Sequence, residues 1–190
     1  MTYFLDFDRT LFDTDSFTPT LLNNPACAHL REDIQKFVVT PRDATIPGGA
    51  GRVETWEKLD VLCREGKLSF APNALTQFIF PDVRGFLELH GKDSVILSYG
   101  HPAWVRAKVE SALAGFPLER IIYAEQQEKG IALKPLLPLF SAPYSFVDDL
   151  AAQLDSVKTH CAQVSLYEMR RDGKEGSGRY PVIRSFADIS

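Results

Sequence analysis

Short apolar runs alternate with stretches of helical periodicity along most of the chain. Apolar runs that are this short and rich in aromatic and β-branched residues are typical of buried strands. We expect strands at Tyr3–Leu5, Ser94–Leu97, Arg120–Tyr123, Tyr144–Val147, Gln163–Tyr167 and Tyr180–Arg184. Helical spacing of apolar residues predicts helices at Val83–His90, Pro102–Ala114, Ile131–Phe140 and Leu150–His160. This alternation predicts an α/β fold with a parallel sheet covered by helices on both faces.

The segment from Thr14 to Phe80 interrupts the alternation. Leu30–Val38 and Glu54–Arg64 have helical spacing, whereas Pro41–Gly51 contains the proline and glycines of a loop. We therefore predict that this segment is an inserted, mostly helical lobe.

Composition narrows the classes of protein that fit. A chain of 190 residues with 45% hydrophobic and 24% charged residues can bury one core and carry an inserted lobe. The net charge of −4, without a long basic stretch, argues against nucleic-acid binding. Three widely separated cysteines argue against a disulfide framework or a zinc site. Without a signal peptide or a membrane-length apolar run, the expected location is the cytoplasm.

Polar residues follow three of the expected strands. Asp6 and Asp8 follow the first, Ser98 lies at the end of the second, and Asp148 and Asp149 end the fourth. Ligands of open parallel sheets bind beyond the carboxyl ends of the strands. Four carboxylates gathered there repel one another unless a cation is present. A divalent ion with oxygen ligands is therefore expected, and Mg²⁺ suits a site that must also hold phosphate.

Four segments resemble, in the same order, the motifs of the haloacid dehalogenase (HAD) superfamily. They are Asp6-Phe7-Asp8-Arg9-Thr10-Leu11 after an apolar run, Ser98-Tyr99-Gly100, Lys129-Gly130 and Val147-Asp148-Asp149. Together they span nearly the whole chain. The resemblance implies a Rossmann-like, three-layer catalytic core made of residues 1–13 and 81–190, with a helical cap at residues 14–80.

The resemblance also implies an activity, namely Mg²⁺-dependent hydrolysis of a small phosphorylated metabolite by a phosphoric monoester hydrolase. Asp6 would attack phosphorus and form an aspartyl-phosphate, which divides a difficult displacement into two steps. Asp8 would act as general acid and then general base. Lys129 would neutralise the nucleophile and the transferring group, although Lys134, which precedes a proline, is an alternative.

Ligand-binding roles follow from the same motifs. The phosphoryl group would be held by Thr10, Ser98, Tyr99 and Gly100. The metal would be held by Asp6, Asp148, Asp149 and the backbone carbonyl of Asp8. The position four residues after Asp149 carries no acidic side chain, unlike many relatives, so a further carboxylate at the metal is not expected there.

Two other functions fit the same motifs. A phosphomutase would return the phosphate to a second hydroxyl of its substrate, and a catalytically idle regulatory module would keep the metal site alone. Asp8 argues against a dehalogenase, because carbon–halogen cleavage needs no proton donor at that place. The physiological substrate and the oligomeric state stay open.

Overall fold

The computed structural model describes residues 1–39, 50–124 and 128–189, and these form two compact units. The first unit comprises Met1–Phe12, Ile79–Tyr99 and Gly115–Ser190, and the second comprises Asp13–Phe78 and Gly100–Ala114.

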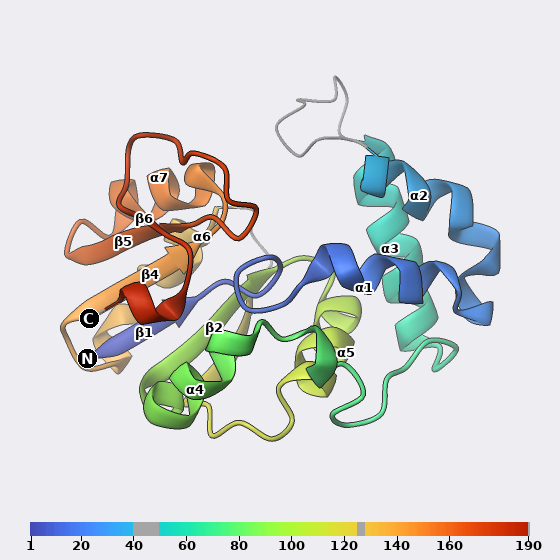
Figure 1. Cartoon of the computed structure of the whole chain (residues 1–190), viewed down its shortest axis with the longest axis horizontal. Coiled ribbons are helices and arrows are strands. Elements are labelled where there is room, and N and C mark those ends of the chain that lie inside the picture. Colours follow the sequence, from blue (N-terminus) through green and yellow to red (C-terminus); the bar gives the residue numbers. More distant parts are fainter. Residues whose placement is uncertain (40–49, 125–127, 190) are drawn as a thin grey trace. The chain divides into compact units, whose positions relative to one another are not determined.

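The first unit is built on a six-stranded, fully parallel sheet with the order β3-β2-β1-β4-β5-β6 (Figure 1). The strands are β1 (Thr2–Leu5), β2 (Ser94–Tyr99), β3 (Arg120–Ala124), β4 (Tyr144–Asp148), β5 (Val164–Met169) and β6 (Val182–Ile183). The predicted α/β fold with a parallel sheet is thus confirmed. The last strand is shorter than expected and pairs through two residues.

Both faces of the sheet are buried, which explains why its central strands are continuous apolar runs rather than alternating ones. On one face, Phe4, Val95 and Phe146 pack in a cluster with Leu133 from α6 (Lys129–Leu133) and Leu154 from α7 (Ala151–His160). On the other face, the ring of Tyr3 meets that of Phe86 in α4 (Pro81–His90) at 5.1 Å between centroids. Helices therefore cover the sheet from both sides.

The helices of this unit follow the predicted positions except around the prolines. They are α4 (Pro81–His90), α6 (Lys129–Leu133) and α7 (Ala151–His160), with 3₁₀ turns at Gly91–Asp93, Leu137–Leu139 and Phe186–Asp188. The expected helix at 131–140 is instead the short α6 followed by a 3₁₀ turn. Pro135 and Pro138 lack the amide hydrogen that a continuous helix needs, which explains the break.

The second unit is helical. It contains α1 (Thr14–Leu22), α2 (Arg31–Val39), α3 (Ala50–Arg64) and α5 (Pro102–Ala112), with 3₁₀ turns at Pro25–Leu30 and Thr76–Phe78. The helix α1 was not predicted. It contains Pro19, and Asp13 caps its start by accepting from the amide of Ser16 at 3.0 Å. The loop expected at 41–51 lies mostly outside the described residues, and Ala50 begins α3.

The helix α5 packs in this second unit. The buried carboxylate of Asp60, in α3, accepts hydrogen bonds from the backbone amides of Ala103 (2.7 Å) and Trp104 (3.1 Å). These amides are among those that a helix leaves without intrahelical partners at its start. Asp60 thus joins two helices that are distant in sequence. The sequence division into a core and a cap at residues 14–80 stays a prediction.

Among the described helices, none has the length and apolar character needed to span a lipid bilayer.

Gly130 marks a close approach between α6 and α7. A Cβ atom at this position would lie 2.2 Å from the backbone oxygen of Ser156, and the Gly130 amide donates to the Ser156 hydroxyl at 3.0 Å. Glycine is required at position 130 because there is no room for a Cβ atom, and not because the backbone adopts an unusual conformation. This contact fixes the spacing between the two helices.

We predict that Gly130→Ala lowers the free energy of unfolding by about 1–3 kcal/mol, because the helices must separate to accept the methyl group. Gly85→Ala is the matched control, since Gly85 is in the interior of α4 and an added methyl group there would meet no atom within 4 Å. It should raise stability by about 0.5–1 kcal/mol. Urea denaturation of both variants measures the difference, and an unchanged stability of Gly130→Ala would contradict the packing argument.

Candidate active site

Strand pairing places Asp6 and Asp148 side by side at the carboxyl edge of the sheet. Leu5 is the register partner of Val147, and Asp6 and Asp148 are the next residues of the two strands' chains. The amide of Asp6 continues the ladder by donating to the carbonyl of Val147 at 2.9 Å. Asp149 follows directly, so parallel pairing brings together residues that are distant in sequence.

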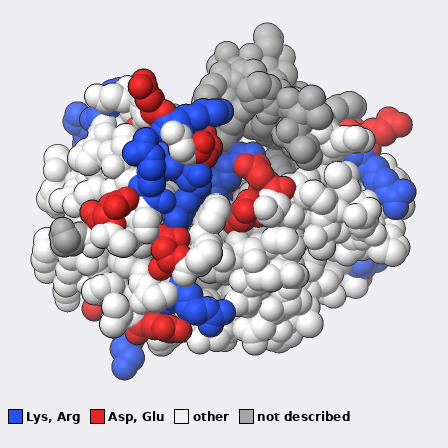
Figure 2. All heavy atoms as spheres, viewed as in Figure 1, with Lys and Arg blue, Asp and Glu red and all other residues white. Residues whose placement is uncertain are grey.

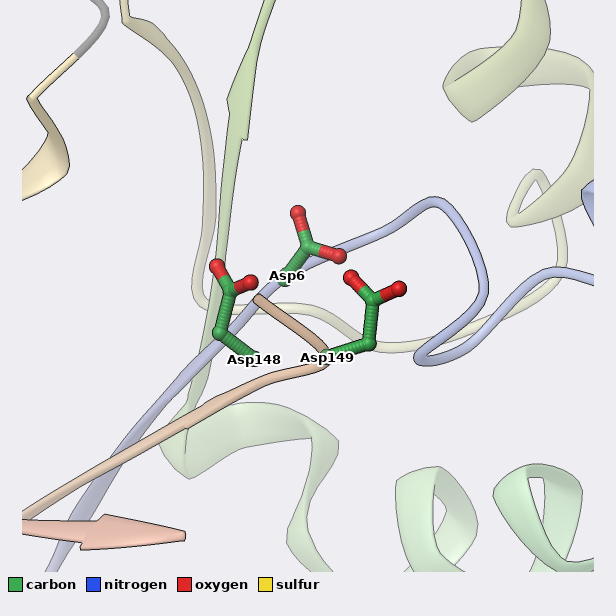
Figure 3. Close-up of side chains that lie close together, drawn as sticks. All are labelled: Asp6, Asp148 and Asp149. Atoms are coloured by element: carbon green, nitrogen blue, oxygen red, sulfur yellow. The ribbon is translucent and has the colours of Figure 1, made fainter. Parts of the chain in front are cut away.

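The carboxylates of Asp6, Asp148 and Asp149 lie close together (Figure 3). Each offers an oxygen, and these oxygens all lie within 4.8 Å of one another. Asp6 and Asp148 are buried, and Asp149 is half-buried. Oxygen-only ligands at this spacing are the donor set that a hard divalent cation prefers.

Lys129 lies between two of these carboxylates. From the first position of α6, its ammonium group donates to Asp6 Oδ1 and to Asp148 Oδ2, the latter at 2.7 Å. Lys129 is 3% exposed, whereas Lys134 is exposed to solvent. Of the two lysines considered from the sequence, the structure thus brings Lys129 to the carboxylates.

Burial and mutual charge shape the electrostatics of this cluster. Desolvation raises the pKa of Asp148 to about 6, to which the nearby Asp6 charge contributes, while Lys129 acts in the opposite direction. Desolvation by itself would lower the pKa of Lys129, but the Asp148 and Asp6 charges outweigh it and raise that pKa. A divalent cation at this cluster would offset the mutual repulsion of the carboxylates.

A tight loop after β1 orients the Asp6 carboxylate. The amides of Leu11 and Phe12 both donate to the carbonyl of Phe7, and Arg9 adopts a positive φ of 63°. This winding brings the fully buried Thr10 back toward the strand end, where its hydroxyl donates to Asp6 Oδ2 at 3.0 Å. Both oxygens of Asp6 are therefore held, one by Lys129 and the other by Thr10.

Asp8 lies in the same loop and is half-buried, and it is not one of the three carboxylates that group together. Ser98 is 2% exposed near the end of β2, whose pairing with β1 brings it to the carboxyl edge. Tyr99 is 43% exposed. Gly100 has a φ of 148° and belongs to the second unit. The ligand-binding roles given to these residues stay predictions.

Sequence reasoning missed the residues that support Lys129. Gln153 lies four residues after Asp149, where many relatives carry an acidic residue. Its side chain accepts a hydrogen bond from the Lys129 amide at 3.1 Å and so holds the start of α6 in place. The Ser156 hydroxyl accepts from the next amide, that of Gly130, at 3.0 Å. The signal was present in the spacing, because Gln153 and Ser156 lie three residues apart on one side of α7.

Figure 2 shows one face of the molecule, on which a group of Lys and Arg side chains lies beside Asp and Glu side chains. The expectation that the protein does not bind nucleic acid stays a prediction.

Comparisons with known proteins identify the fold. The sequence matches no family model and no curated protein. Several solved structures similar to the chain are described as HAD-type hydrolases, so the chain has the fold of that superfamily, as its motifs predicted.

Three of these structures cover almost the entire chain. A haloacid dehalogenase-like hydrolase from Burkholderia xenovorans has a TM-score of 0.65 and 17% identity, covering 99% of this chain and 94% of its own. CbbY from Rhodobacter sphaeroides, in complex with phosphate, has a TM-score of 0.57 and 15% identity, covering 100% and 96%. The HAD-hydrolase YfnB from Bacillus subtilis, bound to magnesium, has a TM-score of 0.58 and 15% identity, covering 99% and 96%.

We predict that Mg²⁺ binds at the three-carboxylate cluster and raises the thermal unfolding midpoint. A concentration about 100 times the dissociation constant should stabilise the folded protein by about 2.7 kcal/mol. Asp149→Asn removes a charged ligand and should weaken Mg²⁺ binding by at least about tenfold. Thermal denaturation across a Mg²⁺ titration measures both effects.

Asp93→Asn is the matched control for this titration. Asp93 is an exposed carboxylate just before β2, at the opposite end of the strands. Its variant should bind Mg²⁺ as the unaltered protein does. Equal Mg²⁺ responses in both variants and the unaltered protein would rule out the cluster as the binding site.

Proposed function

We propose that the protein is a Mg²⁺-dependent phosphatase that hydrolyses a small phosphorylated metabolite through an aspartyl-phosphate on Asp6. The observation that carries the proposal is the convergence of Asp6, Asp148, Asp149 and Lys129 at the carboxyl edge of the sheet. The HAD fold and the phosphate held by CbbY, a protein of that fold, support it further.

Asp6 is suited to act as the nucleophile because its carboxylate is held in one orientation. Lys129 donates to Oδ1 and Thr10 donates to Oδ2. A fixed carboxylate loses little orientational freedom when it attacks phosphorus, and this pre-organisation lowers the barrier. Lys129 also neutralises negative charge that would otherwise repel a phosphate ester.

Asp8 is placed two residues further along the same loop and is half-buried. In the proposed reaction it donates a proton to the leaving oxygen. It then takes a proton from the water that hydrolyses the aspartyl-phosphate. The loop after β1 thus supplies both the nucleophile and the acid/base.

The donor set fits Mg²⁺, because it offers three carboxylates whose oxygens lie within 4.8 Å of one another. Asp6, Asp148 and Asp149 would hold the ion, together with the backbone carbonyl of Asp8. When bound, the ion would supply charge neutralisation for the carboxylates and a phosphate oxygen. Lys129 offsets the repulsion between Asp6 and Asp148 by bonding to both.

The lobe at residues 14–80 is proposed to act as the cap that selects the substrate, which is a small-molecule phosphate ester rather than a nucleic acid. A cytoplasmic location fits such a metabolite. The magnesium-bound structure of YfnB is described as revealing interdomain movement, which is the behaviour expected of a fold in which a second domain opens and closes during turnover.

We predict that the purified protein releases phosphate from p-nitrophenyl phosphate with Mg²⁺ and that EDTA abolishes the release. Asp6→Asn should reduce kcat by at least about a thousandfold, because the amide is a poor nucleophile. Asp8→Asn should reduce it by about a hundredfold to ten-thousandfold through loss of the acid/base. Phosphate release under saturating Mg²⁺ is the measurement.

Assays of the other possible products distinguish the phosphatase from a phosphomutase and from a dehalogenase. Isomer formation from hexose phosphates without phosphate release would indicate the phosphomutase. Halide release from a 2-haloacid, without activity on phosphate esters, would indicate a dehalogenase. Retention of phosphatase activity by Asp6→Asn would show that Asp6 is not the nucleophile.

We also predict that Lys129→Met and Lys134→Met differ sharply in kcat. Loss of the ammonium group between Asp6 and Asp148 should lower kcat by about a hundredfold to a thousandfold. Lys134 is exposed, so its variant should keep nearly full activity. Circular dichroism establishes that both variants are folded. A comparable loss in both would contradict the assignment of Lys129.

A further inference from the structure

The loop that carries Asp6 and Thr10 is also contacted by the guanidinium group of Arg171. Arg171, in the connection between β5 and β6, donates from Nε (3.2 Å) and Nη2 (3.0 Å) to the backbone carbonyl of Thr10. The two residues are 161 positions apart. A paired contact from a planar guanidinium fixes direction as well as distance.

Arg171 is itself held firmly. Its Nη1 donates to Asp82 Oδ1 at 2.7 Å and to the carbonyl of Arg184 at 3.1 Å, and the side chain is 11% exposed. The guanidinium lies 4.4 Å from the ring centroid of Phe80 and 5.5 Å from that of Phe186. Ionic, hydrogen-bonding and cation–π contacts thus leave this side chain little freedom.

Asp82 anchors the arrangement from α4. Its Oδ2 accepts from the amide of Phe186 at 2.7 Å and from the hydroxyl of Ser185 at 3.2 Å. The carboxylate therefore joins the first turn of α4 to the segment after β6, with Arg171 between them and the loop after β1. This network is more than a surface ion pair, because one carboxylate and one guanidinium connect three segments that are distant in sequence.

We propose that Arg171 is a positioning residue for the nucleophile, an inference that rests on the proposed role of Asp6. Arg171 holds the carbonyl of Thr10, and the hydroxyl of the same residue donates to Asp6 Oδ2 at 3.0 Å. Arg171 does not touch the reacting atoms. It restrains the loop, and through Thr10 it keeps the Asp6 carboxylate aimed at the substrate phosphorus.

The test compares Arg171→Met with Arg170→Met. Methionine keeps an apolar stem beside Phe80 and Phe186 but cannot donate to Thr10. Arg170 is the matched control, since it is adjacent and forms ion pairs with Asp172 and Glu168. Arg171→Met should lower kcat by about tenfold to a hundredfold with little change in KM, because a misplaced reactive group lowers the rate without weakening binding. Arg170→Met should keep the kcat of the unaltered protein.

A double-mutant cycle shows whether Arg171 acts through Thr10. If it does, Arg171→Met combined with Thr10→Val should have nearly the kcat of Thr10→Val alone. Independent, multiplicative losses would overturn the proposal, as would an unchanged kcat in folded Arg171→Met. If Arg171→Met does not fold, Arg171→Lys replaces it; a single ammonium cannot bond to Thr10 and Asp82 in the same geometry, so an intermediate loss of kcat is expected.

Hydrogen exchange separates this inference from the proposed function. In Arg171→Met, amides of residues 9–12 should exchange faster than in Arg170→Met, whether or not the protein has phosphatase activity. If the unaltered protein is inactive on phosphate esters, the proposed function fails, and faster exchange still supports the restraint of the loop by Arg171. Equal exchange in the two variants would overturn that restraint.

Discussion

The candidate site depends on one electrostatic constraint, the burial of like charges at the carboxyl edge of the sheet. Asp6 and Asp148 are brought together by backbone pairing between β1 and β4, and their backbones cannot move apart without breaking that ladder. Lys129 makes the arrangement possible by donating to both. Burying an isolated charge is strongly unfavourable. The folded state therefore depends on the ion pairs of the cluster, and those ion pairs depend on the fold that brings the three side chains together.

The support around Lys129 shows how packing serves this constraint. Gln153 and Ser156, both on α7, accept from the first two amides of α6. These amides have no intrahelical partners, so the contacts satisfy them and fix where the short helix begins. Because α6 has five residues, little in its own hydrogen bonding would hold it in place. Its position, and with it that of Lys129, comes from α7.

The strands and the carboxylates were predictable because their signals are local. Apolar runs such as Ser94–Leu97 mark buried strands, and parallel strands place their carboxyl ends together, so aspartates after two such runs were expected to meet. Pro135 and Pro138 carry a local signal for the break in the helix expected at 131–140. The helix α1 was not predicted; it contains Pro19, and its start is stabilised by a side-chain cap.

Contacts that depend on tertiary structure gave no comparable signal. Arg171 resembles part of a charged surface run, since nothing near it in the sequence indicates a carbonyl acceptor at Thr10. Asp82 likewise resembles an ordinary residue in the first turn of a helix. Their relation arises because the connection after β5 returns to α4 and to the loop after β1, and such a return cannot be read from spacing or periodicity.

The Arg171 contact has a consequence for the order of events during synthesis. A ribosome adds Arg171 161 residues after Thr10. The loop after β1 is therefore synthesised well before the guanidinium that holds it, and the Phe186 amide that bonds to Asp82 is added later still. On a nascent chain, β1, β2 and β4 can pair before Arg171 restrains the loop that carries Asp6.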